Sequence, residues 1–172
     1  MKPTEHLSDN HLIDSIHHGD LQAFELLYDR YAGKVLKRCF FICLNEEQAR
    51  DLMQEVWIKV FLNLHTFKKE AAFSSWLYRL TTNHCLNYLK TKARSEQPFP
   101  ISPPTTTSPI TQTIEVHTLL NKLSMEDRTL LALKFMGEYT YEEISAICEI
   151  SVSAAKMRVS RLITKLREEI NS

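Results

Sequence analysis

Six side chains suited to binding nucleic acid recur at helical spacing between residues 76 and 94. They follow at steps of three, four, four, three and four: Trp76, Arg79, Asn83, Asn87, Lys90 and Arg94. An aromatic ring can stack on a base, amides can pair with base edges, and cations attract phosphates. On one helix face, these groups indicate a nucleic-acid surface. A solvated helix face with one half-buried Trp would give the same spacing.

A helix from about Ser74 to Lys90 would position this face. Its opposite side is expected in the core and carries Leu77, Thr81, Cys85, Tyr88 and Leu89. A preceding helix from Asp51 to about Leu64 has a broad apolar stripe at spacings of three and four residues. The members of this stripe are Leu52, Met53, Val56, Trp57, Val60, Phe61 and Leu64. A short basic and aromatic loop joins the two helices.

The side of the first helix that should be polar carries acidic and apolar groups together. Asp51, Gln54 and Glu55 share this ridge with Ile58 and Leu62. Such a mixture suits docking onto another protein better than contact with water alone. We therefore predict a protein-binding surface there.

The length and composition predict an all-α protein. A chain of 172 residues can form one medium domain or two small ones, and its three glycines accompany long apolar stripes of helical period. No apolar run reaches the roughly 18 residues of a membrane helix, and no signal-peptide pattern opens the chain. We expect a cytoplasmic protein without membrane insertion.

The formal net charge of zero conceals an uneven distribution along the chain. Up to Asp29 there is one Lys against six acids, whereas Arg30 to Arg94 holds twelve Lys or Arg against five acids. A basic segment in a neutral chain indicates a localised binding site for a polyanion.

The cysteines and histidines give no sign of catalysis. Cys39 and Cys43 lie one helical turn apart, but Cys85 and Cys148 stand alone and no CxxC pair is present. Small buried hydrophobes are the expected role, not a disulfide framework or a zinc site. The neighbours His84 and Cys85 would point about 100° apart on a helix, so they cannot form a nucleophile and base. We expect a protein that is not an enzyme and has no metal or cofactor.

Helices are also expected at both ends of the chain. One begins near Ser8 or Asp9 and ends at Gly19, and another follows from Asp20.

From Ser95 to about Thr111, five prolines interleaved with Ser and Thr indicate a linker. The predicted architecture is therefore two small helical domains joined by a Pro/Ser/Thr-rich tether.

The C-terminal part is predicted to hold short helices that include a helix-turn-helix. The expected segments are Gln112 to Lys122, Ser124 to Gly137, a helix opened by the capping box of Thr140-Tyr141-Glu142-Glu143 with Ile144 and Ile147 inward, and a final helix capped by Ser151. The final helix buries Ala155, Val159, Leu162 and Leu166. Its other side carries Ser153, Met157, Ser160, Arg161 and Thr164, flanked by Lys156, Arg158, Lys165 and Arg167. No acid lies between Ser151 and Arg167, as expected for a helix that contacts duplex DNA.

Ordered motifs along most of the chain resemble bacterial RNA polymerase sigma factors of the extracytoplasmic-function group. The region-2 motifs are Asp51-Leu-Met-Gln-Glu, Phe67 to Phe73, Ser75-Trp-Leu-Tyr-Arg79 and Asn83 to Leu89, preceded by Gly19-Asp20 and Ala23-Phe24. The region-4 motifs are Leu123 to Arg128 and Tyr139 to Leu166. The resemblance implies a region-2 domain over residues 1–94, a linker over 95–111 and a region-4 helix-turn-helix domain over 112–172.

The resemblance implies a promoter-specificity subunit that binds core RNA polymerase, recognises promoter DNA and helps melt the −10 element, with an anti-sigma factor as a further partner. The linker would thread through the polymerase between the two DNA sites. With the residue chemistry above, it assigns polymerase binding to Asp51, Gln54, Glu55 and Ile58. It assigns −10 binding to Phe67, Lys68, Lys69, Phe73, Trp76, Arg79, Asn83, Asn87 and Lys90. It assigns −35 binding to Ser153, Lys156, Met157, Arg158, Ser160, Arg161, Thr164 and Lys165.

Some positions depart from the common family pattern, and two other functions remain as alternatives. Ser124 replaces a common Pro, Ser153-Ala154-Ala155 replaces Gly-Thr-Val, and Ile163 stands at a commonly basic position, which leaves the −35 sequence preference open. A helix-turn-helix regulator acting without polymerase would leave the Asp51–Ile58 ridge unexplained. A thiol enzyme using Cys85 or Cys39 lacks supporting geometry.

Overall fold

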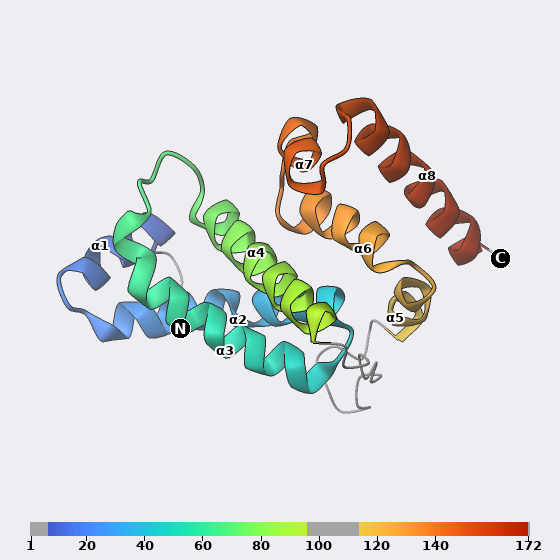
Figure 1. Cartoon of the computed structure of the whole chain (residues 1–172). Helices are drawn as coiled ribbons and strands as arrows, with labels where there is room; N and C mark the ends of the chain where they lie inside the picture. Colours follow the sequence, from blue (N-terminus) through green and yellow to red (C-terminus); the bar gives the residue numbers. More distant parts are fainter. Residues whose placement is uncertain (1–6, 96–113, 172) are drawn as a thin grey trace.

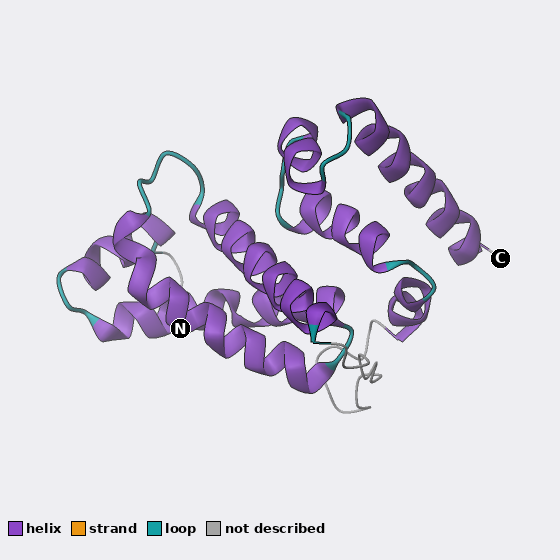
Figure 2. Ribbon diagram, in the orientation of Figure 1, coloured by secondary structure: helices purple, strands orange, loops and turns teal. Residues whose placement is uncertain are grey.

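The computed structural model describes residues 7–95 and 114–171, and within these ranges every regular element is a helix (Figures 1 and 2). The elements in chain order are α1 (Asp9–His17), α2 (Leu21–Cys43), α3 (Glu46–Asn63), a 3₁₀ turn η1 (Leu64–Thr66), α4 (Phe73–Arg94), α5 (Ile114–Asn121), α6 (Met125–Leu131), η3 (Ala132–Met136), α7 (Tyr141–Cys148) and α8 (Val152–Asn171). The all-α prediction is confirmed.

Helices α1 to α4 form what we call the N-terminal bundle, residues 7–95, in which α2 packs against α1, α3 and α4. Each of the first three helices starts at a side-chain cap, and these caps are Ser8, Asp20 and Asn45. The prediction that α3 starts at Asp51 was wrong by five residues. The Asn45 side chain accepts a hydrogen bond from the Gln48 amide at 3.0 Å, so the helix begins at Glu46.

The core of the N-terminal bundle is built largely from the predicted stripes. Leu52, Val56, Trp57, Val60, Leu77 and Cys85 are all buried. Phe61 also belongs to the predicted apolar stripe, but it is 53% exposed. Its ring meets the edge of Phe24 at a centroid distance of 5.4 Å, at the margin of the contact between α2 and α3. The predicted stripe on α3 is wider than the surface that α2 and α4 can cover.

Helices α5 to α8 form the C-terminal bundle, residues 114–171. Ser124 caps α6, and α6 continues into the wider π-helical turn η3. Thr140 and Glu143 form the predicted capping box at the start of α7. Glu149 adopts a left-handed conformation with φ of 55° and turns the chain from α7 into α8, completing the helix-turn-helix. Ile144 is buried as predicted, but Ile147 is 39% exposed, so its predicted inward position was wrong.

The two bundles touch, with α4 lying beside the end of the C-terminal bundle that holds α6 and α7 (Figure 1). At one end of the contact, Leu44 is fully buried in a cluster of C-terminal leucines, namely Leu120, Leu123, Leu131 and Leu162. At the other end, polar side chains of α4 meet Glu138 and Tyr139, which follow η3, and Glu143 in the first turn of α7. The linker predicted over residues 95–111 lies, apart from Ser95, outside the described residues.

No helix in the described ranges has both the length and the apolar character needed to cross a lipid bilayer. No cluster of three or more His, Cys, Asp or Glu side chains in residues 7–95 and 114–171 is arranged to hold a metal ion.

Candidate nucleic-acid interface

The predicted nucleic-acid residues of α4 lie together on one side of this helix. We call Trp76, Arg79, Asn83, Asn87 and Lys90 the strand face. The helix is fixed in rotation by its opposite side, where Leu77, Cys85 and Leu89 are buried, so the strand face points away from the bundle core. Asn83, Asn87 and Lys90 are exposed, whereas Trp76 and Arg79 are half-buried.

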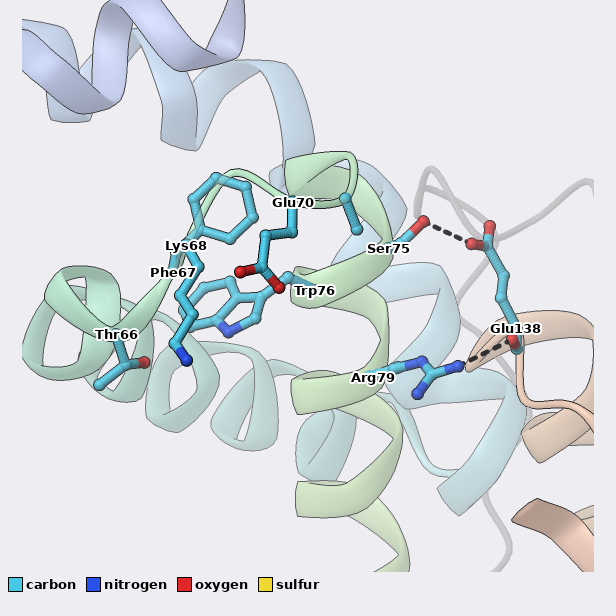
Figure 3. Close-up of a pocket in the computed structure, with 9 residues that line it drawn as sticks. Thr66, Phe67, Lys68, Glu70, Ser75, Trp76, Arg79 and Glu138 are labelled. Carbon is cyan, nitrogen blue, oxygen red and sulfur yellow. Dashed lines mark hydrogen bonds between the residues drawn. The ribbon is translucent and has the colours of Figure 1, made fainter.

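A cavity of about 560 Å³ opens beside the start of the strand face, and we call it the loop pocket (Figure 3). It is lined by Thr66, Phe67, Lys68, Glu70, Ala71, Ser75, Trp76, Arg79 and Glu138. Its base is aromatic, because the Trp76 ring lies 5.7 Å from the Phe67 ring between centroids. Its rim carries the Lys68 ammonium and the Arg79 guanidinium. A flat ring could therefore enter, with cations nearby for a phosphate.

Phe67 and Phe73, predicted as DNA-binding residues, are both buried. Phe73 is 2% exposed and does not line the loop pocket, so a direct contact with DNA stays a prediction that would require its ring to be uncovered. Phe67 exposes only 7% of its surface, on the wall of the pocket. The two rings pack edge to face at a centroid distance of 5.6 Å, and each lies 5.7 Å from the Trp76 ring. Burial of two phenylalanines stabilises the loop more than exposing them would.

The two lysines of the loop differ in environment. Lys68 is exposed on the rim of the pocket. Lys69 has a left-handed backbone with φ of 57°, and its ammonium is paired with the carboxylate of Asp14 on α1. Hydrogen bonding to Lys69 lowers the pKa of Asp14, so this carboxylate stays charged near neutral pH. Lys69 therefore ties the loop to α1, while Lys68 remains available to a ligand.

A second groove of about 440 Å³ runs along the strand face between α3 and α4. It shares Thr66, Trp76 and Arg79 with the loop pocket and adds Lys59 and Asn63 from α3. These two α3 residues were missed by the sequence analysis. Their spacing of one helical turn was the available signal. Only the packing of α3 on α4 shows that their side chains lie beside the strand face.

The ridge on α3 is exposed as predicted. Asp51, Gln54 and Glu55 are exposed, and Ile58 and Leu62 expose 60% and 61% of their surface. We call this set the docking ridge. Glu55 is held by a neighbour, because its Oε2 atom lies 2.7 Å from Nε2 of His84 on α4.

The exposed side of α8 carries most of the residues predicted to contact duplex DNA. Those exposed are Ser153, Lys156, Met157, Ser160, Arg161, Thr164 and Lys165. Arg158 differs, because its guanidinium donates to Asp127 at 2.9 Å and to Glu126 at 3.2 Å on α6. The side chain of Arg158 is thus turned toward its own bundle and away from the free surface of α8.

The cysteines lie in environments that suppress reactivity. Cys39, Cys43 and Cys85 are buried, as predicted, whereas Cys148 is only half-buried. Burial raises the pKa of Cys43 to about 12. A hydrogen bond with Cys39, together with burial, raises the pKa of the Cys85 thiol. The neighbouring His84 points to Glu55 and not to Cys85, which removes the arrangement of a nucleophile and its base.

Comparison with known proteins points to one family over both bundles. Residues 27–95 match the Sigma-70 region 2 family, and residues 113–166 match the Sigma-70 region 4 family. The chain is 27% identical over 171 residues to the RNA polymerase sigma-H factor of Pseudomonas aeruginosa, covering 89% of each chain. It is 26% identical over 176 residues to the ECF RNA polymerase sigma factor SigW of Bacillus subtilis, covering 92% of this chain and 94% of SigW.

A solved structure shows the same fold. The sigma factor RpoE of Bartonella quintana, in complex with the anti-sigma factor NepR, superposes with a TM-score of 0.63 at 21% identity. The match covers 86% of this chain and 96% of RpoE. The similarity therefore extends through both bundles and is not confined to the helix-turn-helix.

Proposed function

The chain belongs to the extracytoplasmic-function sigma factors, which direct RNA polymerase to promoters, and we propose that its loop pocket captures an unpaired base of the −10 element. The observation that carries this proposal is the loop pocket itself. The Phe67 and Trp76 rings form its floor, and the Lys68 and Arg79 side chains lie on its rim. The strand face continues from the pocket along α4, so the rest of the unpaired strand would follow Asn83, Asn87 and Lys90.

Melting by this site requires no catalytic group. Taking a base out of the stack costs a few kcal/mol, and stacking of one base on an aromatic ring returns about 1–3 kcal/mol. The amides of Asn83 and Asn87 can add hydrogen bonds to base edges, and the cations on the rim can pair with phosphates. Capture of the separated strand thus offsets the cost of opening. We propose a binding subunit without enzymatic activity that acts in the cytoplasm.

The docking ridge and the exposed side of α8 have the other two roles in this proposal. The docking ridge offers carboxylates beside exposed Ile58 and Leu62, a combination suited to a basic and apolar surface on core polymerase. The acid-free exposed side of α8 would enter the major groove at the −35 element. In this proposal residues 1–94 bind polymerase and the −10 element, 112–172 bind the −35 element, and 95–111 connect them.

We also propose an anti-sigma factor as a partner of this chain. The support is that the Bartonella quintana sigma factor of the same fold was solved bound to an anti-sigma factor. A pull-down of the tagged chain from cells that lack the inducing condition, with the docking-ridge variant Glu55→Lys in parallel, would test for such a partner. Recovery of only polymerase subunits would contradict this part of the proposal.

Run-off transcription tests the proposed function as a whole. Core polymerase with the purified chain, given a library of random promoter templates, should produce transcripts that start downstream of a shared pair of sequence elements. Permanganate should then detect unpaired thymines in the −10 element. A regulator acting without polymerase would bind duplex DNA and give no new transcript, and that result would overturn the proposal. The family matches over both bundles do not favour such a regulator.

A further inference from the structure

In the free chain the strand face is already engaged by the C-terminal bundle. We propose that Glu138, Tyr139 and Glu143 form an internal latch, which occupies the groups of α4 that bind the −10 strand and must be displaced by it. This inference rests on the proposed role of the strand face. It adds a competitor for that face, supplied by the same chain.

The latch contacts are specific and converge on three consecutive turns of α4. Arg79 donates to both carboxylate oxygens of Glu143, at 2.8 Å and 3.0 Å. The hydroxyl of Ser75 donates to Glu138 at 2.6 Å, and this contact closes one side of the loop pocket (Figure 3). The Tyr139 hydroxyl donates to Oδ1 of Asn83 at 2.7 Å. Paired partners lie 56 to 64 residues apart in the sequence.

The latch imitates the chemistry of a nucleic-acid strand. A carboxylate that receives two hydrogen bonds from Arg79 takes the place that a phosphate would take. The Tyr139 ring lies 4.5 Å from the guanidinium carbon of Arg79, where a stacked base could otherwise lie. The hydroxyl of Tyr139 uses the amide oxygen of Asn83 that could bind a base edge. Hydrogen bonding to Arg79 lowers the pKa of Glu143, so the carboxylate is charged at neutral pH.

The local structure of residues 137–143 is built to present these groups. A Cβ atom at Gly137 would lie 2.6 Å from the Tyr139 ring, so only glycine lets this ring fold back over the chain. Glu138 adopts a left-handed conformation with φ of 56°, which directs its side chain toward Ser75. Glu143 also caps α7 by accepting from the Thr140 amide at 2.8 Å. The turn into α7 thus places two carboxylates and a phenol against α4.

The contact between the two bundles has a second, apolar end, which fixes how they sit against each other. Leu44 at the end of α2 is buried among leucines of the C-terminal bundle, with Phe41 beside it. Arg38 adds a hydrogen bond from Nε to the Met136 carbonyl at 3.4 Å. By contrast, the exposed side of α8 takes no part in the latch, and Arg161 and Met157 are exposed. The latch should therefore weaken binding of the −10 strand without weakening binding of duplex DNA.

The experiment compares the full-length wild type with the double variant Glu138→Gln/Glu143→Gln. Glutamine at position 143 can still accept from the Thr140 amide, so the capping box and the fold are retained. Glu142→Gln is the matched control, because Glu142 is an exposed neighbour on the same helix. The probe is a short fluorescein-labelled DNA single strand of random sequence, followed by anisotropy. A labelled random duplex is titrated in parallel.

The double variant should bind the single strand about three- to tenfold more tightly, because a larger fraction of the chain is competent to bind. Glu142→Gln should match the wild type, and duplex binding should be unchanged by either substitution. In the wild type, addition of the strand should speed amide hydrogen exchange in residues 138–143, since displaced segments open more often. A ligand that bound without displacing the latch would slow this exchange or leave it unchanged.

Two other outcomes separate the latch from the function on which it rests. If the wild type and the double variant bind the strand equally, while Arg79→Ala loses binding, the latch is overturned and the strand face stands. If neither protein binds the strand, and Arg79→Ala changes nothing, both the latch and the proposed −10 role are overturned.

Discussion

His84 on α4 lies 2.7 Å from Glu55 on α3, measured between Nε2 and Oε2, and this pair joins the docking ridge to the helix that carries the strand face. The Glu55 side chain is more than half exposed, so the pair lies at the protein surface. A basic group of the polymerase that binds Glu55 would have to share or replace this contact. Docking through Glu55, as proposed, would therefore also affect a contact that α3 makes with α4.

Reversal of the charge at Glu55 should weaken assembly with core polymerase. If Glu55 forms a charge pair that is buried on docking, we expect Glu55→Lys to cost about 2–5 kcal/mol of affinity for core polymerase. Fluorescence titration with core polymerase measures the loss. His84→Ala removes only the internal pair, so it should change affinity much less. Unaltered core binding by Asp51→Lys/Glu55→Lys would eliminate the docking ridge as the polymerase site.

Removal of the Asn83 amide should impair promoter opening more than holoenzyme assembly. A bidentate contact between an amide and a base is worth about 1–3 kcal/mol, and Asn83→Ala loses it. Permanganate footprinting of the −10 element reports opening, and native gels report assembly. Tyr139→Phe is the comparison, since it removes the hydrogen bond to Asn83 but keeps the amide, and it should not impair opening. Normal footprints with Asn83→Ala would remove Asn83 from the −10 site.

The cations of α8 should separate into base-contacting, phosphate-contacting and structural groups. We expect Arg161→Ala to cost about 1–3 kcal/mol of binding free energy for the −35 duplex and to relax the sequence preference at one base pair. Lys156→Ala should weaken binding to every DNA sequence equally. It should also reduce the slope of log affinity against log salt concentration by about one. Arg158→Ala should change the salt slope less, because Arg158 is paired with Glu126 and Asp127.

The measurement is binding of −35 duplexes with single-base changes at two salt concentrations. A uniform loss of affinity with Arg161→Ala would assign Arg161 to phosphate contact. The base-contacting role would then pass to its exposed neighbours Met157 and Ser160.

The thiols should be slow to react in the native protein. Burial raises the pKa of Cys43 to about 12 and also raises the pKa of Cys148, so both thiols are mainly protonated at pH 8. We expect a disulfide reagent to modify Cys148 first and the other cysteines only after denaturation. Cys148→Ser should remove the early phase. Fast native labelling of Cys85, with loss of transcription, would instead support a thiol enzyme.

Features fixed by a few neighbouring residues could be predicted from the sequence. The capping box of Thr140 and Glu143 uses residues three apart, so its pattern is visible in the chain and appears in the structure. The exposure of Ile58 on the docking ridge followed in the same way from helical periodicity. In both cases local geometry determines the outcome.

Features that depend on distant packing could not be predicted in this way. Phe73 has the aromatic character of a base-stacking residue, and only the surrounding rings of Tyr31 and Phe67 show that it is buried. The same holds for Glu143, whose carboxylate caps its own helix and also binds Arg79 on α4. Helical periodicity gives the face on which a side chain lies, but it does not give the element that covers this face.

The burial of Leu44 has a consequence for the lifetime of the protein in the cell. Its buried apolar neighbours in that cluster all come from the C-terminal bundle, so separation of the bundles would expose a leucine worth about 1.5–3 kcal/mol of burial. An open chain without polymerase would then present Leu44 and Leu131 to proteases and chaperones. We expect the closed form to protect free chains from degradation and the polymerase to protect open chains that are bound to it. Chains that are both open and unbound would then be degraded.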